Sequence, residues 1–292
     1  MKNASLSILF CIFLCFFLVF QRDLPENEPE FAGEIKVYNH LTGEIFSMGL
    51  EEYTARCMSS EMPSSFHIEA LKAQAVAIRS YTLSKKADDL HKGARVCTDF
   101  NHCAAFSDEK EELSAVYKEA VEATKNQVLL YNGKIANTVF HAMSSGKTEN
   151  AEDVWGGKVP YLVSADCDCD RMVKNYTTVQ EFTKKQIEDS LDVSEISVGK
   201  IEKTESGGVK SINIGGKTIK GSEVRKALGL RSSAFDVEKN DNGLKFTVYG
   251  YGHGVGMSQY GADGFARSGM DYKEILAHFY KGTELISIDF DA

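Results

Sequence analysis

An alanine-rich segment from Glu61 to Thr82, EMPSSFHIEALKAQAVAIRSYT, constrains the fold of this chain most strongly. Its composition predicts a helix over about residues 66–86, with Ser64 or Ser65 as the N-cap and Pro63 near the entry. Most amphipathic helices carry Leu or Ile along the buried face, whereas the body of this one carries alanines: Ala70, Ala73, Ala75 and Ala77. Small side chains let neighbouring backbone come close, so we expect this helix to be packed tightly inside the protein.

The remaining patterns favour an α+β fold over an α/β fold, because strands and helices do not alternate as βαβ units. Hairpins are predicted at residues 34–46 and 127–140, the second around an Asn-Gly turn. Helices are predicted at residues 108–125, 179–191 and 222–228, a helix or strand at 48–60, and further helices as far as Lys281. Residues 88–108 and 141–157 are predicted to be loops, and residues 171–245 a smaller α/β-type subdomain.

The first residues of the chain predict a single membrane-spanning helix. Leu6 to Phe20 are almost all apolar, and the run ends in bulky residues instead of the small residues that precede a signal-peptide cleavage site. We therefore expect an uncleaved anchor at residues 1–21, an acidic linker at 22–33, and a functional domain at 34–292 outside the cytoplasm. A formal net charge of −9 argues against a nucleic-acid partner, since phosphate binding needs an excess of Lys and Arg.

A glycine-rich segment, YGYGHGVGMSQYGA from Tyr249 to Ala262, is the second conspicuous motif. Glycines alternate around His253 in the form GxGxGxG, which fits neither the dinucleotide-binding nor the P-loop pattern. Glycine is costly in a strand, so its repetition indicates either a tight turn or a backbone that a ligand approaches closely. A lone histidine is more often structural than catalytic, but one flanked by glycines is expected to face a cleft.

Glu69 is the candidate acid of the alanine-rich helix. Taken alone, it is explained by a favourable interaction with the helix dipole or by an ordinary i,i+3 pair with Lys72. The two polar Gly/Ser-rich loops elsewhere in the chain favour a functional role, because a stable core does not require them.

The segment CTDFNHC predicts a metal site. Cys97, His102 and Cys103 supply thiolate and imidazole ligands that suit zinc. A Cys97–Cys103 disulfide or buried free thiols remain open as alternatives. Cys167 and Cys169 form a C-x-C pair that offers alternative ligands.

Several segments together resemble the stage II sporulation protein D family of peptidoglycan lytic transglycosylases. They are EMPSSFHIEALKAQAVAIR (61–79), SSGKTENAEDVWG (144–156), PYL (160–162), GSEVRKALGLRSSAF (221–235) and GHGVGMSQYGA (252–262). Their order and number make the resemblance specific, and it extends over about residues 34–286. The family also carries an N-terminal membrane anchor.

The resemblance implies cleavage of MurNAc–GlcNAc bonds in peptidoglycan glycan strands, without water, to give 1,6-anhydro ends. It aligns the catalytic acid with Glu69, while Glu61 is the second candidate. One carboxyl suffices, because it first protonates the glycosidic oxygen and then accepts the proton of the C6 hydroxyl. Trp155 is a candidate for stacking on a sugar. The polar residues expected to bind sugar are Lys72, Gln74, Arg79, Ser144, Ser145, Thr148, His253, Ser258, Gln259 and Tyr260.

The family further implies a structural Cys/His zinc site in some members and none in many others. It implies a partner amidase and a polytopic membrane protein, in septal wall remodelling and engulfment during sporulation. Two other functions are considered: a zinc amidase or peptidase, which the absence of an H-E-x-x-H motif disfavours, and a noncatalytic glycan-binding scaffold that activates a partner amidase. The chemistry of a lytic transglycosylase requires no cofactor.

Overall fold

The computed structural model describes residues 33–88, 91–100, 102–107 and 113–288. The anchor predicted at residues 1–21 lies outside the described residues, as does the linker apart from Gly33. Within the described ranges, no helix combines the length and the apolar character needed to cross a bilayer.

The described residues form an α+β fold, as the sequence predicted. The helices are α2 (Leu50–Glu61), α3 (Ile68–Ser84), α4 (Ala115–Ala123), α5 (Ala151–Trp155), α6 (Lys184–Leu191), α7 (Gly221–Leu228), α8 (Gln259–Arg267) and α9 (Tyr272–Phe279), with a 3₁₀ helix η2 (Asp168–Met172). The strands are β1 (Glu34–Tyr38), β2 (Ile45–Gly49), β3 (Val96–Cys97), β4 (Gln127–Tyr131), β5 (Lys134–Ile135), β6 (Phe140–His141), β7 (Thr177–Thr183), β8 (Val198–Lys203), β9 (Val209–Ile214), β10 (Lys217–Lys220), β11 (Phe235–Lys239), β12 (Gly243–Tyr249), β13 (Met257–Ser258) and β14 (Glu284–Ser287).

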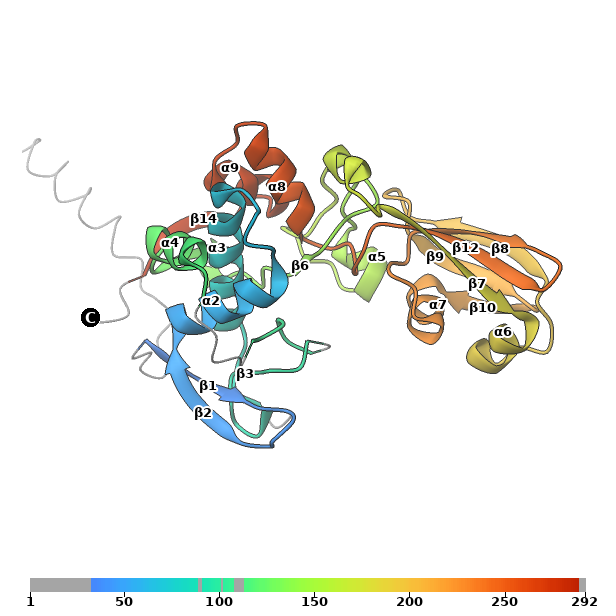
Figure 1. Cartoon of the computed structure of the whole chain (residues 1–292), viewed down its shortest axis with the longest axis horizontal. Helices are drawn as coiled ribbons and strands as arrows, with labels where there is room; N and C mark the ends of the chain where they lie inside the picture. Colours follow the sequence, from blue (N-terminus) through green and yellow to red (C-terminus); the bar gives the residue numbers. More distant parts are fainter. Residues whose placement is uncertain (1–32, 89–90, 101, 108–112, 289–292) are drawn as a thin grey trace, which may run out of the picture.

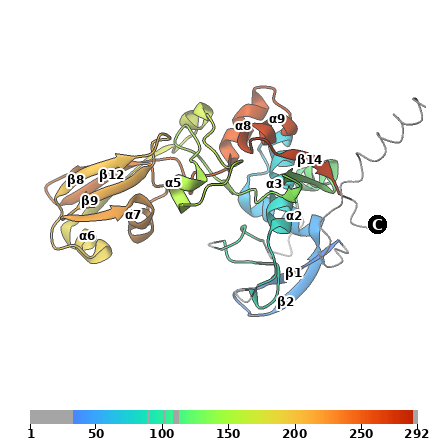
Figure 2. The same ribbon diagram turned by 180° about the vertical axis from the view of Figure 1, so that it is seen from behind.

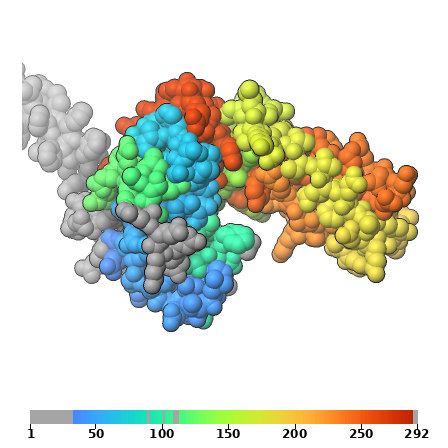
Figure 3. Space-filling model, in the orientation of Figure 1, coloured from blue at the N-terminus to red at the C-terminus, as the bar shows by residue number. Residues whose placement is uncertain are grey.

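The molecule is elongated and has two lobes (Figure 1). The larger lobe contains α2, α3, α4, α8 and α9, and the smaller lobe contains β7 to β12 with α6 and α7. Helix α5 and strand β6 lie between them, and the view from behind also shows α5 there (Figure 2). Each lobe has its own cluster of buried apolar side chains. The surface is hollowed between the lobes on the lower side of the view (Figure 3).

Helix α3 is the centre of the larger lobe. Its alanines Ala70, Ala73, Ala75 and Ala77 are all fully buried. Helices α2, α4, α8 and α9 and strand β4 contact this one helix. Short side chains allow so many elements to approach the same axis, which confirms the close packing expected of the alanine-rich segment.

Two three-stranded antiparallel sheets form the smaller lobe, in the orders β10-β9-β8 and β11-β12-β7. Strand β7 enters this lobe and β12 leaves it, and the two are paired along their whole length, with Thr177 opposite Tyr249. The chain therefore enters and leaves the smaller lobe at adjacent points.

The two predicted hairpins are formed, although the second is shorter than predicted, because β5 ends at Ile135 and Phe140 belongs to β6, which pairs with β13. Strand β1 pairs with β2, and β4 pairs with β5 around Asn132 and Gly133, which have φ values of 51° and 75° as a type I′ turn requires.

Three local predictions are corrected. Helix α3 is capped by His67 and not by Ser64 or Ser65, because those serines lie in the turn that the Phe66 N–H closes onto the Pro63 carbonyl. Residues 177–183 are the strand β7 and not the beginning of a helix, since the Thr-Thr-Val run pairs with β12. The loop predicted at 141–157 contains the short helix α5.

Candidate functional site

Glu61 ends helix α2 at the junction of three segments that the sequence singled out. Its Oε1 accepts a hydrogen bond from the Ala105 backbone N–H at 2.7 Å, in the loop that follows the CTDFNHC segment. Its Oε2 accepts a hydrogen bond from Gln259 Nε2 at 3.0 Å, at the end of the glycine-rich segment. Burial raises the pKa of the Glu61 carboxyl, and this effect is larger than the lowering of the pKa by the two hydrogen bonds. A partly buried carboxyl of this kind can carry a proton at a higher pH than an exposed one.

Glu69 lies in the first turn of α3, as predicted, but its surroundings differ from those of Glu61. Its Oε1 is 2.7 Å from the Lys72 Nζ, and its Oε2 accepts the Tyr272 backbone N–H at 2.9 Å. The i,i+3 pair considered from the sequence is therefore formed, and it occupies Lys72 as well. Both glutamates accept hydrogen bonds at both oxygens, but only Glu69 has a charged donor, the Lys72 ammonium group, whereas the donors to Glu61 are neutral.

A cavity of about 360 Å³ lies between the Ser144–Thr148 loop, α5 and the smaller lobe. Ser144, Ser145 and His253 from the predicted set line it, together with Trp155. The ring centres of Trp155 and His253 are 5.2 Å apart, and Trp155 is 51 % exposed. Burial, with Arg225 nearby, lowers the pKa of His253 to about 4, so its ring is neutral at neutral pH and can donate and accept hydrogen bonds. Neither Glu61 nor Glu69 lines this cavity.

Glu149 contributes a second buried carboxyl, at the wall of this cavity. Its Oε1 accepts hydrogen bonds from Thr204 Oγ1 and the Gly208 N–H, both at 3.0 Å, while its Oε2 has no hydrogen-bond partner among the described residues. Burial raises its pKa. It belongs to the SSGKTE motif, but nothing within the motif distinguishes it from other acids, because its partners come from the smaller lobe.

Other residues of the predicted set have internal roles. Arg79 is fully buried; its guanidinium pairs with the Glu51 carboxylate at 2.6 Å and donates to the Gln127 carbonyl. Thr148 is fully buried and its hydroxyl accepts the Ala165 N–H. Gln74 is also fully buried, and its amide has no hydrogen-bond partner among the described residues. We therefore do not assign these three to sugar binding.

The start of α8 holds the last members of the set. Ser258 is fully buried and caps the helix by accepting the Gly261 N–H. Gln259 is buried and donates to Glu61, as described above. The Tyr260 ring packs edge-on against Phe66 with ring centres 4.9 Å apart. Gln259 is thus the member of the set that contacts Glu61, whereas Lys72 contacts Glu69.

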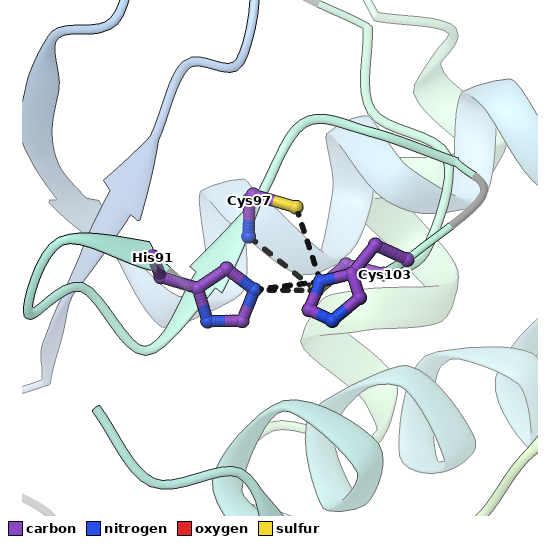
Figure 4. Close-up of side chains that lie close together, drawn as sticks. His91, Cys97 and Cys103 are labelled. Carbon is purple, nitrogen blue, oxygen red and sulfur yellow. Dashed lines mark hydrogen bonds between the residues drawn. The ribbon is translucent and has the colours of Figure 1, made fainter. Parts of the chain in front are cut away.

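Four side chains of the larger lobe form a candidate metal centre: His91, Cys97, His102 and Cys103. Their ligand atoms all lie within 4.8 Å of one another. Cys97 Sγ and Cys103 Sγ are 3.7 and 3.8 Å from His102 Nδ1, and Cys103 Sγ is 3.5 Å from His91 Nε2. Figure 4 shows His91, Cys97 and Cys103 converging from the loops around β3.

This donor set fits zinc, because two sulfurs and two nitrogens are a common tetrahedral set. His91 Nδ1 lies 3.1 Å from the Asp88 carboxylate, and Nε2 of the same ring points toward the other ligands, 2.8 Å from His102 Nδ1. Both cysteines are free thiols, so the alternative Cys97–Cys103 disulfide is not formed. Burial raises the pKa of the Cys103 thiol to about 12, so a metal ion must displace its proton on binding.

The CTDFNHC segment predicted three of these four ligands, and His91 was not among them. The spacing H-x₅-C-x₄-H-C contains the signal, but a histidine in a polar loop before the motif does not stand out by itself. Only the parallel pairing of β3 with β1 fixes the loop that carries His91 against the cysteines.

The family profile "SpoIID: Stage II sporulation protein" matches residues 38–131. The chain is 34 % identical over 272 residues to "Stage II sporulation protein D" of Bacillus subtilis (strain 168), an alignment that covers 87 % of this chain and 79 % of the relative. The corresponding protein of Bacillus amyloliquefaciens gives the same identity and coverage. The chain is also 29 % identical to "Amidase enhancer" of B. subtilis (strain 168), over 78 % of this chain and 39 % of that protein. The profile and the identity to both Bacillus proteins show that this chain belongs to the SpoIID family.

Proposed function

We propose that this chain is a lytic transglycosylase that cleaves the MurNAc–GlcNAc bonds of denuded peptidoglycan strands and leaves 1,6-anhydro ends. The observation that carries the proposal is the Glu61 carboxyl, which is partly buried, has a raised pKa, and contacts both the glycine-rich segment and the loop after the metal centre. A reaction without a water nucleophile needs one carboxyl that alternates between acid and base.

The surroundings of the two candidate acids favour Glu61 over Glu69 as that carboxyl. A general acid must hold a proton in the pH range of the reaction, and desolvation at Glu61 favours the protonated form. The C-terminal end of α2 acts in the same direction, because the helix dipole disfavours a negative charge there. Glu69 has instead an ammonium group at 2.7 Å and a backbone donor as its partners.

In this mechanism protonated Glu61 donates its proton to the glycosidic oxygen as the bond to the anomeric carbon breaks. The carboxylate that remains then accepts the proton of the C6 hydroxyl, whose oxygen attacks the anomeric carbon and closes the anhydro ring. Gln259 Nε2 and the Ala105 N–H hold the carboxyl in place through both steps. They also stabilise the carboxylate formed midway.

The cavity between the lobes is assigned to sugars away from the cleaved bond. Trp155 offers an exposed aromatic face, and the polar residues His253, Ser144 and Ser145 line the same cavity. An apolar face beside a few polar groups suits a sugar ring, which has both characters. Glycan strands are long polymers, so sugars bound at a distance from the acid increase the affinity and align the cleaved bond with the acid.

We propose zinc at His91, Cys97, His102 and Cys103, in a structural role. Zinc would fix the loop that carries Cys103, and Ala105 of this loop donates to Glu61. The metal thus acts on the acid through backbone position, and the chain's own groups carry every proton.

Residues 1–21 are proposed to anchor the protein in the cell membrane with the catalytic domain outside the cytoplasm, on the mother-cell side of the septum or the engulfing membrane. The proposed partners are an amidase and a polytopic membrane protein of the engulfment complex. Family membership in sporulation and the "Amidase enhancer" relative support this assignment.

Digestion of purified denuded glycan strands, followed by mass spectrometry of the products, tests the activity and the acid together. Wild type is expected to produce 1,6-anhydro ends, Glu61→Gln to lose at least about 100-fold in rate, and Glu69→Gln to lose less than about tenfold. Gln keeps the size of Glu and one acceptor oxygen, but its amide group cannot cycle a proton. Loss of activity in Glu69→Gln with Glu61→Gln active would return the catalytic role to Glu69.

A noncatalytic scaffold that activates an amidase is the second candidate, favoured by the relative named "Amidase enhancer". It predicts glycan binding without anhydro ends in wild type, and an unchanged stimulation of the amidase by Glu61→Gln. The same digestion with and without the amidase separates the two functions.

A further inference from the structure

A second cluster of metal-ligating side chains lies away from His91 and Cys103, where η2 meets α8. It consists of Cys167, Cys169 and Asp170, whose ligand atoms lie within 4.8 Å of one another. Cys167 is fully buried and Cys169 is partly exposed. Both are free thiols, and the two sulfurs are 3.9 Å apart. The proposed function uses none of these three residues.

The sulfur separation matches two ligands on one tetrahedral ion. With zinc–sulfur bonds of about 2.3 Å and a tetrahedral angle, the two sulfurs stand about 3.8 Å apart. Helix α8 leaves room for them, since it presents glycines there. A Cβ added at Gly261 would come within 2.2 Å of Cys167 Sγ, and one added at Gly264 within 2.9 Å of Cys169 Sγ.

Asp170 provides an independent indication of a cation. Its side chain is fully buried, and its Oδ2 accepts hydrogen bonds from the Ser144 N–H, the Ser144 hydroxyl and the Ser258 hydroxyl, at 2.8, 2.6 and 2.8 Å. Its Oδ1 is buried and has no hydrogen-bond partner among the described residues. A buried carboxylate oxygen without a partner is costly, and a bound cation removes that cost.

We propose that Cys167 Sγ, Cys169 Sγ and Asp170 Oδ1 bind a zinc-type divalent cation, with water as the fourth ligand. Two thiolates and one carboxylate select a soft to intermediate ion over Mg²⁺ or Ca²⁺, which prefer oxygen ligands alone. On binding, both thiols release their protons to solvent.

The consequence of this site is a fixed junction between two parts of the proposed glycan-binding region. Asp170 already ties the Ser144 loop to Ser258 at the start of α8, and the next residue, Gln259, contacts Glu61. A cation on the other oxygen of Asp170 fixes the orientation of this carboxylate. The site is therefore expected to hold the loop and the helix in register.

Metal titration of the reduced full-length protein tests the proposal with a readout that does not depend on activity. The first metal centre is removed by the double substitution Cys97→Ser and Cys103→Ser, so that the second is observed alone. In this background one equivalent of Zn²⁺ is expected to bind, and bound Co²⁺ is expected to show thiolate-to-metal charge-transfer absorption. Zn²⁺ is also expected to protect Cys167 and Cys169 from alkylation, located by peptide mass spectrometry, and a chelator to reverse the protection.

Two carboxylates provide a matched pair of variants. Asp170→Asn keeps the shape of the side chain and is expected to weaken Zn²⁺ binding at least tenfold. Asp168→Asn, which changes the exposed residue between the cysteines, is expected to leave the affinity within about twofold, because its carboxylate pairs with Arg171 at 3.0 Å. Circular dichroism confirms that each variant is folded.

The proposal is overturned if the background protein binds no Zn²⁺, or if Asp168→Asn and Asp170→Asn weaken binding equally. It is also overturned if mass spectrometry of protein kept under air shows a Cys167–Cys169 disulfide that persists when Zn²⁺ is present during oxidation. Should Asp170→Asn not fold, the single substitution Cys169→Ser, at the partly exposed ligand, replaces it with the same expected loss.

Discussion

Two glutamates on successive helices show how local surroundings decide what a carboxyl can do. Desolvation has the largest effect on the pKa of Glu61, and the hydrogen-bond donors to this carboxyl are neutral. Glu69 instead has an ammonium group at 2.7 Å. The sequence motif contains both residues, and the resemblance ranked Glu69 first. That ranking took no account of Gln259 and Ala105, the partners of Glu61, because they come from distant segments. Burial and partners are tertiary properties, so the choice of acid could not be predicted.

The first prediction concerns the pH dependence of the proposed activity. The raised pKa of Glu61 keeps the carboxyl protonated above the ordinary glutamate value of about 4.3. Because the reaction begins from the protonated form, kcat/KM is expected to fall as pH rises through the pKa of Glu61. The measurement is a pH profile on glycan strands, with Glu69→Gln as the control, whose profile should keep the same limb. A limb that moves in Glu69→Gln would contradict the assignment.

The pH dependence of stability follows with the same sign. Between the unfolded pKa and the raised folded pKa of Glu61, the folded protein binds more protons, so the contribution of this residue to stability falls as pH rises. Glu61→Gln is expected to reduce this fall. The free energy of unfolding of both proteins, measured by urea denaturation at several pH values, gives the difference. A steeper fall in the variant would be inconsistent with the raised pKa.

A further prediction at the residue scale concerns Arg79. The resemblance places Arg79 among the sugar-binding residues, whereas the structure places it in the core. Arg79→Met is expected to lower the free energy of unfolding by about 3 kcal/mol, because it leaves the partly buried Glu51 carboxylate and the Gln127 carbonyl without their partner. Lys184→Met, which removes an exposed i,i+4 pair, is the control and should change stability by less than about 0.5 kcal/mol. Urea denaturation measures both, and a cost below 1 kcal/mol for Arg79→Met would contradict the structural role.

At the scale of elements, the sequence predicted those whose signals are local. The alanine-rich helix, the Asn-Gly hairpin and α7 all depend on periodicity or turn chemistry within their own segment. Strand β7 was taken for the start of a helix because its partner β12 lies far away in the sequence. The same holds for the candidate metal centre. The local C-x₄-H-C spacing predicted three ligands, whereas His91 is brought to them by the tertiary fold.

The glycine-rich segment provides the prediction at this scale. Gly256 has φ 74°, and a Cβ there would come within 2.1 Å of the Val139 carbonyl oxygen, where β13 pairs with β6. Gly256→Ala is expected to cost more than about 2 kcal/mol, from left-handed strain plus the displaced strand. Gly269→Ala is the matched control, with φ 100° but no atom within 4 Å, and should cost about 1 kcal/mol. Equal losses in thermal stability would show that the close approach at Gly256 is unimportant.

At the scale of the whole molecule, the two lobes have separate cores but share the cavity that we assign to glycan binding. Thr177 and Tyr249 are paired where the chain enters and leaves the smaller lobe, so a short turn can join the flanking residues without displacing the larger lobe. Replacing residues 177–249 by a Gly-rich turn is therefore expected to leave the larger lobe folded. It would still retain its His91–Cys103 metal centre.

This deletion separates local chemistry from substrate binding. The deleted protein is expected to keep the helical circular dichroism signal and the Zn²⁺ stoichiometry of the larger lobe, and to lose at least tenfold in affinity for glycan strands, because one wall of the cavity is removed. Substitution of Trp155 by Ala in the complete chain is the control for the cavity, and should weaken glycan binding without changing metal content. Full glycan affinity in the deleted protein would show that the larger lobe binds the strand by itself, and the cavity would lose its assigned role.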